Sequence, residues 1–180
     1  MTPAQNATLR AYIEANPVWM AYPHNSNGSD DIAKQLNALT ADYYVWNNQT
    51  PIQSIYDSIV WANMTPAAAP DTTAIYTNRA LQCQAKQINL QILIQGRDTV
   101  DASKTSVRAG LQDSLTNLCS GAGGAVVSAG WTAVRDSMKK LATGLEKVLA
   151  TGAGTQASPS VTSDVMTTSF YEIQQLMDWG

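Results

Sequence analysis

The fold of this chain is decided by residues 126–150, which read VVSAGWTAVRDSMKKLATGLEKVLA. Apolar side chains recur there at alternating steps of four and three residues: Val127, Trp131, Val134, Met138, Leu141, Leu145 and Val148. Steps of this length place side chains on one face of an α-helix. The stretch therefore predicts one long amphipathic helix whose apolar face packs into a core.

The residues that follow change character abruptly. Residues 151–155 read TGAGT, and residues 151–169 contain no Lys or Arg and a single acid, Asp164. A glycine-rich break of this kind predicts the end of a helix and a hinge. We expect a helical domain over residues 1–151 and an extended C-terminal arm over residues 152–180.

The arm ends in an apolar cluster within FYEIQQLMDWG, residues 170–180. Its candidate partner-binding residues are Phe170, Tyr171, Ile173, Leu176, Met177 and Trp179. Two interpretations remain open for this cluster. Either it anchors the arm on a neighbouring subunit, or it forms a short helix that packs on its own chain.

Helical spacing also runs through most of the chain before residue 126. Periodicity, caps and prolines predict helices over residues 3–15, 29–39, 52–59 and 71–95, and one that starts at Ser103 or Thr105 and reaches Leu118. In the helix over 71–95 we expect the side chains of Ile75, Leu81, Ile88 and Ile92 to lie inside.

The segments between these helices are short and rich in aromatic residues, proline and asparagine. Residues 17–28 are expected to form a loop, residues 43–46 (YYVW) a strand or an extended anchor, and residues 66–70 (PAAAP) a linker. The predicted fold class is therefore mainly α. It is a bundle of about five to six helices with irregular aromatic loops and the C-terminal arm.

The composition is unusually poor in charge. The chain has 180 residues, of which 44% are apolar and 14% charged, with a net charge of −3. A typical soluble domain has about a quarter of its residues charged. A charge-poor surface suits a subunit that partners cover, although drift in composition would give the same numbers. The slight acid excess provides no general attraction for nucleic acid or acidic membranes.

The sequence has no stretch typical of a membrane protein or a secreted one. No apolar run approaches the roughly 20 residues that span a bilayer. The first residues, MTPAQN, lack the basic and apolar regions of a secretory signal. We therefore expect a soluble protein that is made in the cytoplasm and does not bind a membrane.

Residues with catalytic or metal-binding chemistry are few. His24 is the only histidine, which excludes a site with several histidines within one chain. Cys83 and Cys119 are far apart in sequence and have no neighbouring ligands of the zinc type. The adjacent acids Asp30 and Asp31 are typical of a helix start. We expect no enzyme activity, no cofactor and no metal.

Two glycine-rich segments superficially resemble phosphate-binding loops. Residues 121–124 read GAGG and residues 152–154 read GAG. Neither is followed by the Lys-Ser/Thr pair of a nucleoside triphosphate loop. The first is interpreted as a turn between helices and the second as a helix C-cap.

Four cations lie on the predicted helix over 126–150, mostly away from its apolar face. They are Arg135, Lys139, Lys140 and Lys147. They form either an ordinary solvated face or a modest basic strip that meets nucleic acid or an acidic neighbour.

Four stretches of the chain, taken in order, resemble one family. They are residues 2–5 (TPAQ), 43–46 (YYVW), 101–110 (DASKTSVRAG) and 141–155 (LATGLEKVLATGAGT). Together they resemble structural proteins of tailed bacteriophages, the head completion or head–tail connector (adaptor) proteins. The likeness covers most of the chain up to residue 154, and no motif matches beyond it.

This resemblance implies a virion protein of the phage neck that is not an enzyme. In such connectors helical subunits form a ring, typically of twelve, below the portal, and a C-terminal segment docks on the portal. The expected partners are further copies of the chain, the portal protein, tail or neck proteins, and DNA that passes through without sequence-specific binding. A lumen of this kind should avoid strongly basic walls, which would hold the genome by its phosphates.

Two other functions stay open. The chain could be a different neck component, such as a stopper or a tail terminator. A soluble helical ligand-binding domain or enzyme is the alternative from another class, against which the shortage of His, Cys and paired acids counts.

Overall fold

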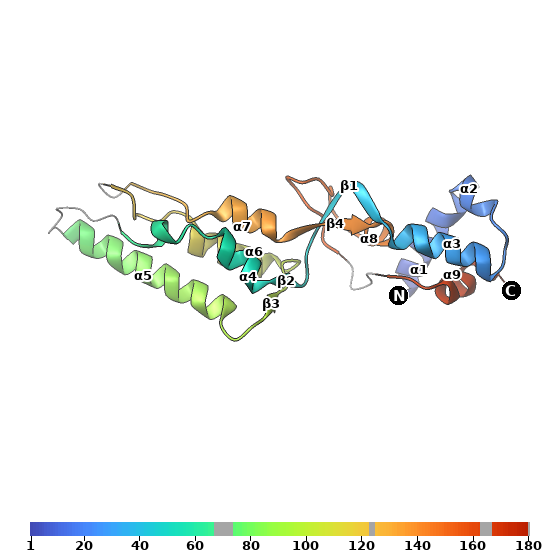
Figure 1. Ribbon diagram of the computed structural model, residues 1–180, viewed down its shortest axis with the longest axis horizontal. Helices are drawn as coiled ribbons and strands as arrows, with labels where there is room; N and C mark the ends of the chain where they lie inside the picture. Colours follow the sequence, from blue (N-terminus) through green and yellow to red (C-terminus); the bar gives the residue numbers. More distant parts are fainter. Residues whose placement is uncertain (67–73, 123–124, 163–166, 180) are drawn as a thin grey trace. The chain divides into compact units, whose positions relative to one another are not determined.

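The computed structural model describes residues 1–66, 74–122, 125–162 and 167–179, with the side chains of 74–77 left out. The described chain is mainly helical, as the periodicity predicts (Figure 1). It divides into two compact units. Unit 1 comprises Met1–Trp46 and Lys140–Gly180, and unit 2 comprises Asn47–Lys139. Unit 2 is therefore inserted between the two segments that build unit 1.

Unit 1 contains the two ends of the chain. Its helices are α1 (Pro3–Glu14), α2 (Pro17–Met20), α3 (Ser26–Asn37), α8 (Gly144–Leu149) and α9 (Phe170–Met177). Strand β1 (Leu39–Trp46) pairs with β4 (Lys139–Thr143).

Side-chain caps explain where the N-terminal helices begin. Thr2 and Gln5 form a capping box at the start of α1. The side chain of Asn25 accepts hydrogen bonds from the backbone of Asn27 and Gly28, so α3 begins at Ser26. The helix predicted from residue 29 therefore starts three residues earlier.

The core of unit 1 forms where α1, α3, α8 and α9 meet. The buried side chains come from both ends of the sequence: Leu9, Ile13, Trp19, Ile32, Ala33, Leu36, Leu145, Ile173, Met177 and Trp179. Burial of aliphatic side chains at 0–1% exposure, as for Leu9 and Ile13, is the main stabilising contribution here. Unit 1 therefore needs both chain segments for its core.

Residues 151–161 lie against strand β1 in unit 1. The Tyr44 N–H donates to the Gly154 carbonyl at 2.7 Å, and the Trp46 N–H donates to the Ser160 carbonyl at 3.0 Å. Thr151 and Val161 pair with each other in an antiparallel bridge. The glycine-rich segment is thus a loop held on the strand.

Unit 2 is built around its long helix. Its elements are β2 (Thr50–Pro51), α4 (Ile52–Ser58), the 3-10 helix η1 (Trp61–Met64), α5 (Ala74–Ile94), β3 (Thr99–Val100), α6 (Thr105–Leu115) and α7 (Trp131–Ser137). Helix α5 lies beside α6, and α4 packs on α7 (Figure 1). Strands β2 and β3 are antiparallel, with Thr50 opposite Val100. The predicted helices over 52–59 and 71–95 correspond to α4 and α5. The helix predicted from Ser103 or Thr105 to Leu118 corresponds to α6, which starts at Thr105 and ends at Leu115.

The prediction of one long helix over residues 126–150 is wrong. The stretch forms α7, then strand β4, then α8. Thr143 and Glu146 form a capping box in which the Glu146 N–H donates to Thr143 Oγ1 at 3.1 Å, so a new helix begins at Gly144. The residues before it are extended because they pair with β1. Val134, Met138 and Leu145 are nevertheless fully buried, so the apolar stripe identified core residues but not their secondary structure.

The prediction of an extended arm over residues 152–180 is also wrong for the described residues. Helix α9 packs against α3 within unit 1 (Figure 1). The Asn37 side chain donates to the Thr168 carbonyl at 2.7 Å and accepts from the Thr168 N–H at 2.9 Å. Arg10 donates to the Leu176 carbonyl at 3.1 Å. A domain boundary at residue 151 is therefore not observed, and Asp164 lies outside the described residues.

The remaining sequence predictions fall partly outside the described chain. Of the predicted linker over 66–70, residues 67–70 are not described, and neither are the first three residues of the helix predicted over 71–95. Of the GAGG segment at 121–124, the last two glycines are also not described. The loop expected over 17–28 contains the short helix α2, and the aromatic run at 43–46 lies in strand β1.

Candidate interaction surface

The six residues proposed to bind a partner through the arm divide into two groups. Ile173, Met177 and Trp179 are buried in the core of unit 1, and Leu176 packs partly against it. This placement matches the second interpretation, a helix packed on its own chain. Tyr171 is 66% exposed, and its ring lies 3.9 Å from that of Phe170.

The sole histidine takes part in the same packing. The His24 imidazole stacks on the Trp179 indole with ring centroids 4.4 Å apart and planes 7° apart. Its Nε2 lies 3.4 Å from the Met20 carbonyl oxygen. These contacts position Trp179 on the loop before α3.

The structure brings together no metal or membrane site among the residues that it describes. No three His, Cys, Asp or Glu residues of the described chain cluster in a way that could hold a metal ion. No helix in the described ranges is both long and apolar enough to cross a bilayer. Cys83 is buried, and burial raises the pKa of its thiol.

The four cations proposed as a basic strip are divided between three elements and two units. Arg135 lies on α7, Lys139 and Lys140 on β4, and Lys147 on α8. Because the predicted long helix is interrupted by β4, they do not share one helix face.

Each of these cations also has an acidic or aromatic neighbour. Arg135 and Lys139 contact Asp136, with the Lys139 Nζ at 2.5 Å from the carboxylate. The hydrogen bond from Lys139 lowers the pKa of Asp136. Lys140 donates to the buried Glu146 carboxylate at 2.7 Å, and the Lys147 ammonium lies 5.7 Å from the centre of the Tyr43 ring.

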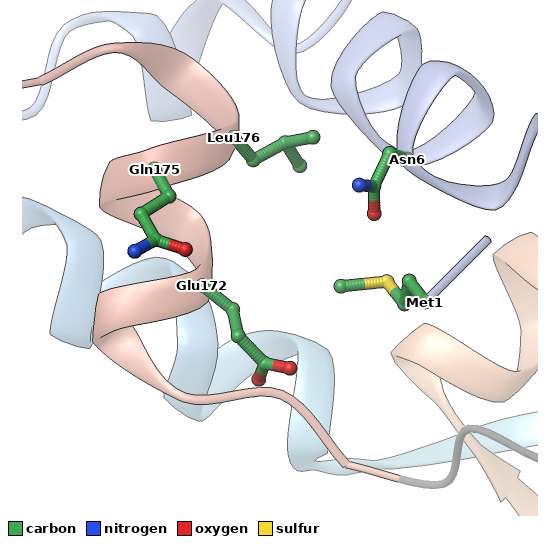
Figure 2. A pocket seen from close by; sticks show the side chains of 5 residues that line it. All are labelled: Met1, Asn6, Glu172, Gln175 and Leu176. Carbon is green, nitrogen blue, oxygen red and sulfur yellow. The ribbon is translucent and has the colours of Figure 1, made fainter. Parts of the chain in front are cut away.

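A small polar hollow lies between one side of α9 and the N-terminal segment with α1 (Figure 2). It has a volume of about 210 Å³ and is lined by Met1, Asn6, Glu172, Gln175 and Leu176. The Glu172 carboxylate accepts hydrogen bonds from the Ser169 N–H at 2.8 Å and from the Thr168 hydroxyl at 3.2 Å. These bonds lower the pKa of Glu172, that from the Ser169 backbone most strongly. The acid therefore serves as a helix cap, and the hollow offers no second titratable side chain.

The most distinctive surface lies on α5 in unit 2. Leu81, Ile88 and Ile92 are 58%, 47% and 67% exposed, and Ala85 between them is also exposed. The four residues follow steps of four, three and four, the spacing of an apolar seam between two packed helices. We call this surface the α5 ridge. The sequence-based expectation that Leu81, Ile88 and Ile92 lie inside is wrong, and the side chain of Ile75, expected inside as well, is not among those described.

The opposite face of α5 explains that error. Cys83, Leu90 and Ile94 are the buried apolar residues among the described side chains of this helix. Helix α5 therefore carries two apolar faces, and one of them is enough to pack it on unit 2. The sequence signal for the second face is a second apolar row, Leu81, Ala85, Ile88 and Ile92, on the side of the helix opposite Cys83, Leu90 and Ile94.

The exposed face of α5 carries no charge among the side chains that are described. Only Arg79 and Lys86 are charged in residues 78–94, and both turn inwards. Arg79 is buried and donates to the Gly121 carbonyl. Lys86 pairs with Asp113 on α6. The polar residues that flank the ridge are amides, among them Gln84, Asn89 and Gln91.

An aromatic groove lies on one side of α5. It has a volume of about 360 Å³ and is lined by Tyr56, Trp61, Gln87, Gln91 and Ile94. The Trp61 ring is stacked on Tyr56 at 5.8 Å, its Nε1 donates to the Tyr56 carbonyl, and the residue is 48% exposed. Gln87 donates to the Met64 carbonyl at 3.1 Å. These contacts position the side chains of Trp61 and Gln87, two of the residues that line the groove.

A second groove lies on the α6 side of α5. It has a volume of about 270 Å³ and is lined by Asn89, Ile92, Leu93, Gly110, Asp113 and Ser114. Ile92 belongs to both this groove and the α5 ridge. The absence of a side chain at Gly110 allows the close approach of α6, because a Cβ there would lie 3.1 Å from Leu93 Cδ1.

The comparisons with known proteins add no identification. No protein-family model matches the chain, and neither a curated protein nor a solved structure is significantly similar to it. The surfaces of unit 2 are therefore interpreted from their own chemistry.

Proposed function

We propose that this chain is a structural subunit of a tailed-phage virion. It would form an oligomeric ring in the neck, join the portal to the tail, and let DNA pass without acting as an enzyme. The proposal starts from the resemblance of residues 2–5, 43–46, 101–110 and 141–155 to connector proteins.

The single structural observation that supports it is the α5 ridge. A monomer in solution rarely leaves an apolar, uncharged face of a long helix open to water. Depletion of charge and enrichment of apolar side chains are typical of the centre of a permanent interface. A subunit surrounded by further copies would bury this face.

The ion pairs of the candidate basic residues fit a channel that lets DNA pass better than they fit a DNA-binding site. Lys139 and Lys140 each have a carboxylate neighbour at 2.5 Å and 2.7 Å. Cations neutralised in this way attract phosphates weakly, so DNA would not be held along the lumen. The proposed partners remain further copies of the chain, the portal protein, and tail or neck proteins.

Native mass spectrometry and negative-stain electron microscopy of the purified chain test the proposal. We expect a closed oligomer, of twelve copies if the family pattern holds, with a central channel wide enough for a DNA duplex. A protein that stays monomeric at concentrations of about 10 μM would contradict it, since permanent interfaces are occupied well below that concentration.

The position of the ring in the particle separates the connector from other neck components. Cryo-electron microscopy of virions that contain the chain should place it directly against the portal. A ring further down the neck would instead identify a stopper or a tail terminator.

A further inference from the structure

We propose that the α5 ridge of one copy inserts into the aromatic groove of the next copy. The contact joins Leu81, Ile88 and Ile92 of one subunit to the groove formed by Tyr56 and Trp61 of its neighbour. This inference rests on the proposed ring and names the two surfaces that would build it.

The symmetry of a ring requires two complementary surfaces on each copy. A cyclic ring of more than two copies needs two different surfaces on each subunit, because a surface that pairs with itself closes a dimer. Unit 2 carries two such surfaces in the described chain, a convex ridge and a concave groove. Both are formed within the same unit, so each copy presents the two in a fixed relation.

The shapes of the two surfaces are complementary. The ridge is a row of exposed aliphatic side chains, and the groove has a volume of about 360 Å³ between the Tyr56 and Trp61 rings and the side chains of Gln87, Gln91 and Ile94. Aliphatic side chains that fill an aromatic pocket are typical of the residues that dominate interface energies, among which Trp and Tyr are enriched. Trp61 is 48% exposed in the isolated chain and would be covered by the neighbour.

Both surfaces are uncharged among the side chains that the structure describes. Neither the exposed face of α5 nor the lining of the groove contains a charged side chain. A nucleic acid or a charged protein partner would find no complementary charge on these surfaces. A second copy of the same chain, which has a net charge of −3, would meet no like charge at this contact. The occupant that fits is therefore another copy.

The groove on the α6 side is less suited than the aromatic groove to receive the ridge of a neighbouring copy. Ile92 lines it and also belongs to the ridge, so the two surfaces would compete for the same space on a subunit. The aromatic groove shares none of the three large ridge residues. Ridge and aromatic groove therefore use different large side chains, as a contact between successive copies of a ring requires.

Complementation between two variants tests the inference. The ridge variant carries Ile88→Lys and Ile92→Lys, both at exposed positions, and the groove variant carries Trp61→Ala. Val18→Lys, at an exposed apolar residue on α2 of unit 1, is the matched control. Circular dichroism of each variant establishes that the fold is kept.

We expect each variant alone to lose self-association by roughly 30-fold or more, as for a hot-spot residue. An equimolar mixture should form heterodimers, because the ridge variant keeps an intact groove and the groove variant keeps an intact ridge. Native mass spectrometry of variants that differ in mass reads this out directly. The Val18→Lys control should assemble like the unchanged protein.

Three results would overturn the inference. If the groove variant assembles normally and only the ridge variant fails, the ridge pairs with itself. If both variants assemble like the unchanged protein, the ring uses other surfaces, and the proposed function stands without this interface. If the two failing variants give no heterodimer when mixed, ridge and groove do not meet. A monomeric unchanged protein would instead contradict the proposed function itself.

Discussion

At the scale of single residues, the close approach of the backbone to the Tyr43 ring explains why the TGAGT segment has glycine at position 154. Gly154 has φ +67°, and a Cβ at this position would lie 2.1 Å from Tyr43 Cε2. Its carbonyl accepts a hydrogen bond from the Tyr44 N–H at 2.7 Å. Only glycine allows the loop to lie on β1 with this ring beneath it.

Gly154→Ala should therefore lower the free energy of unfolding by about 3 kcal/mol, the sum of a left-handed backbone penalty and overpacking. Gly96→Ala is the matched control, because Gly96 has φ +69° and no atom within 4 Å of the added Cβ. Gly96→Ala should cost only about 1 kcal/mol. Urea unfolding measures both, and equal losses would show that the Tyr43 contact does not determine the effect.

A second residue-scale prediction concerns Glu172. Its pKa is lowered, chiefly by the hydrogen bond from the Ser169 backbone. A carboxyl whose pKa is lower in the folded protein contributes stability above its unfolded pKa of about 4.3, and loses that contribution as the pH falls through its folded value.

Glu172→Gln keeps the shape of the cap but removes the titration. We expect the unfolding midpoint of the unchanged protein in urea to fall more steeply between about pH 5 and pH 3 than that of the variant. The two curves should converge at the acidic end. Parallel curves over this range would exclude Glu172 as a contributor to the acid sensitivity.

At the scale of the elements, helix α9 belongs to a core although its sequence is also typical of a docking segment. Ile173 is fully buried, whereas Tyr171 on the same helix is 66% exposed. Ile173→Ala should reduce the free energy of unfolding by about 2–5 kcal/mol, because it leaves a cavity between α9 and α3.

Tyr171→Ala is the control on the same helix and should change stability by less than about 0.5 kcal/mol. Chemical denaturation measures both variants. A small and equal effect of the two substitutions would mean that α9 is not packed on unit 1 in solution.

The elements also indicate how far the sequence could predict this fold. Helices α1, α4 and α6 follow from local signals, such as the cap at Thr2 with Pro3, and Pro51 before Ile52. The stretch over 126–150 was wrongly predicted as one helix for two reasons. Its apolar stripe continues without interruption past Thr143 and Glu146, although these two residues form a capping box that starts a new helix. The pairing of β4 with β1 is a tertiary effect that the local sequence does not show.

The exposure of the α5 ridge could not be predicted from the sequence pattern for a different reason. A helix with apolar residues on two sides gives no sequence signal for which side its own chain covers, and only the packing of Leu90 and Ile94 decides it. The aromatic groove likewise depends on the approach of Trp61 to α5, which no local pattern encodes.

At the scale of the whole molecule, the insertion of unit 2 into unit 1 makes a prediction about independent folding. The chain reaches unit 2 at Asn47 and leaves it at Lys139. The Asn47 N–H donates to the Met138 carbonyl at 2.8 Å, so the two ends of unit 2 are hydrogen-bonded to each other. Unit 2 also has its own core of α4, α5, α6 and α7.

A fragment of residues 47–139 should therefore fold alone, with helical circular dichroism and cooperative thermal unfolding. A fragment of residues 1–46 should stay unfolded, because its core partners Leu145, Ile173 and Met177 come from the other end of the chain. A folded fragment 1–46 would contradict the shared core of unit 1.

The association constant of the assembled molecule should depend only weakly on salt, because the proposed contact surfaces are uncharged. If ridge and groove hold the copies together, no ion pair is screened when salt is added, so the association constant should change less than about threefold between 0.05 M and 0.5 M NaCl. Sodium sulfate should strengthen the association, because it is excluded from protein surfaces and favours apolar burial. Analytical ultracentrifugation over a salt series measures both effects. A loss of tenfold or more in NaCl would assign the assembly to ion pairs, and the charged surfaces of unit 1 or unit 2 would then replace the α5 ridge as its source.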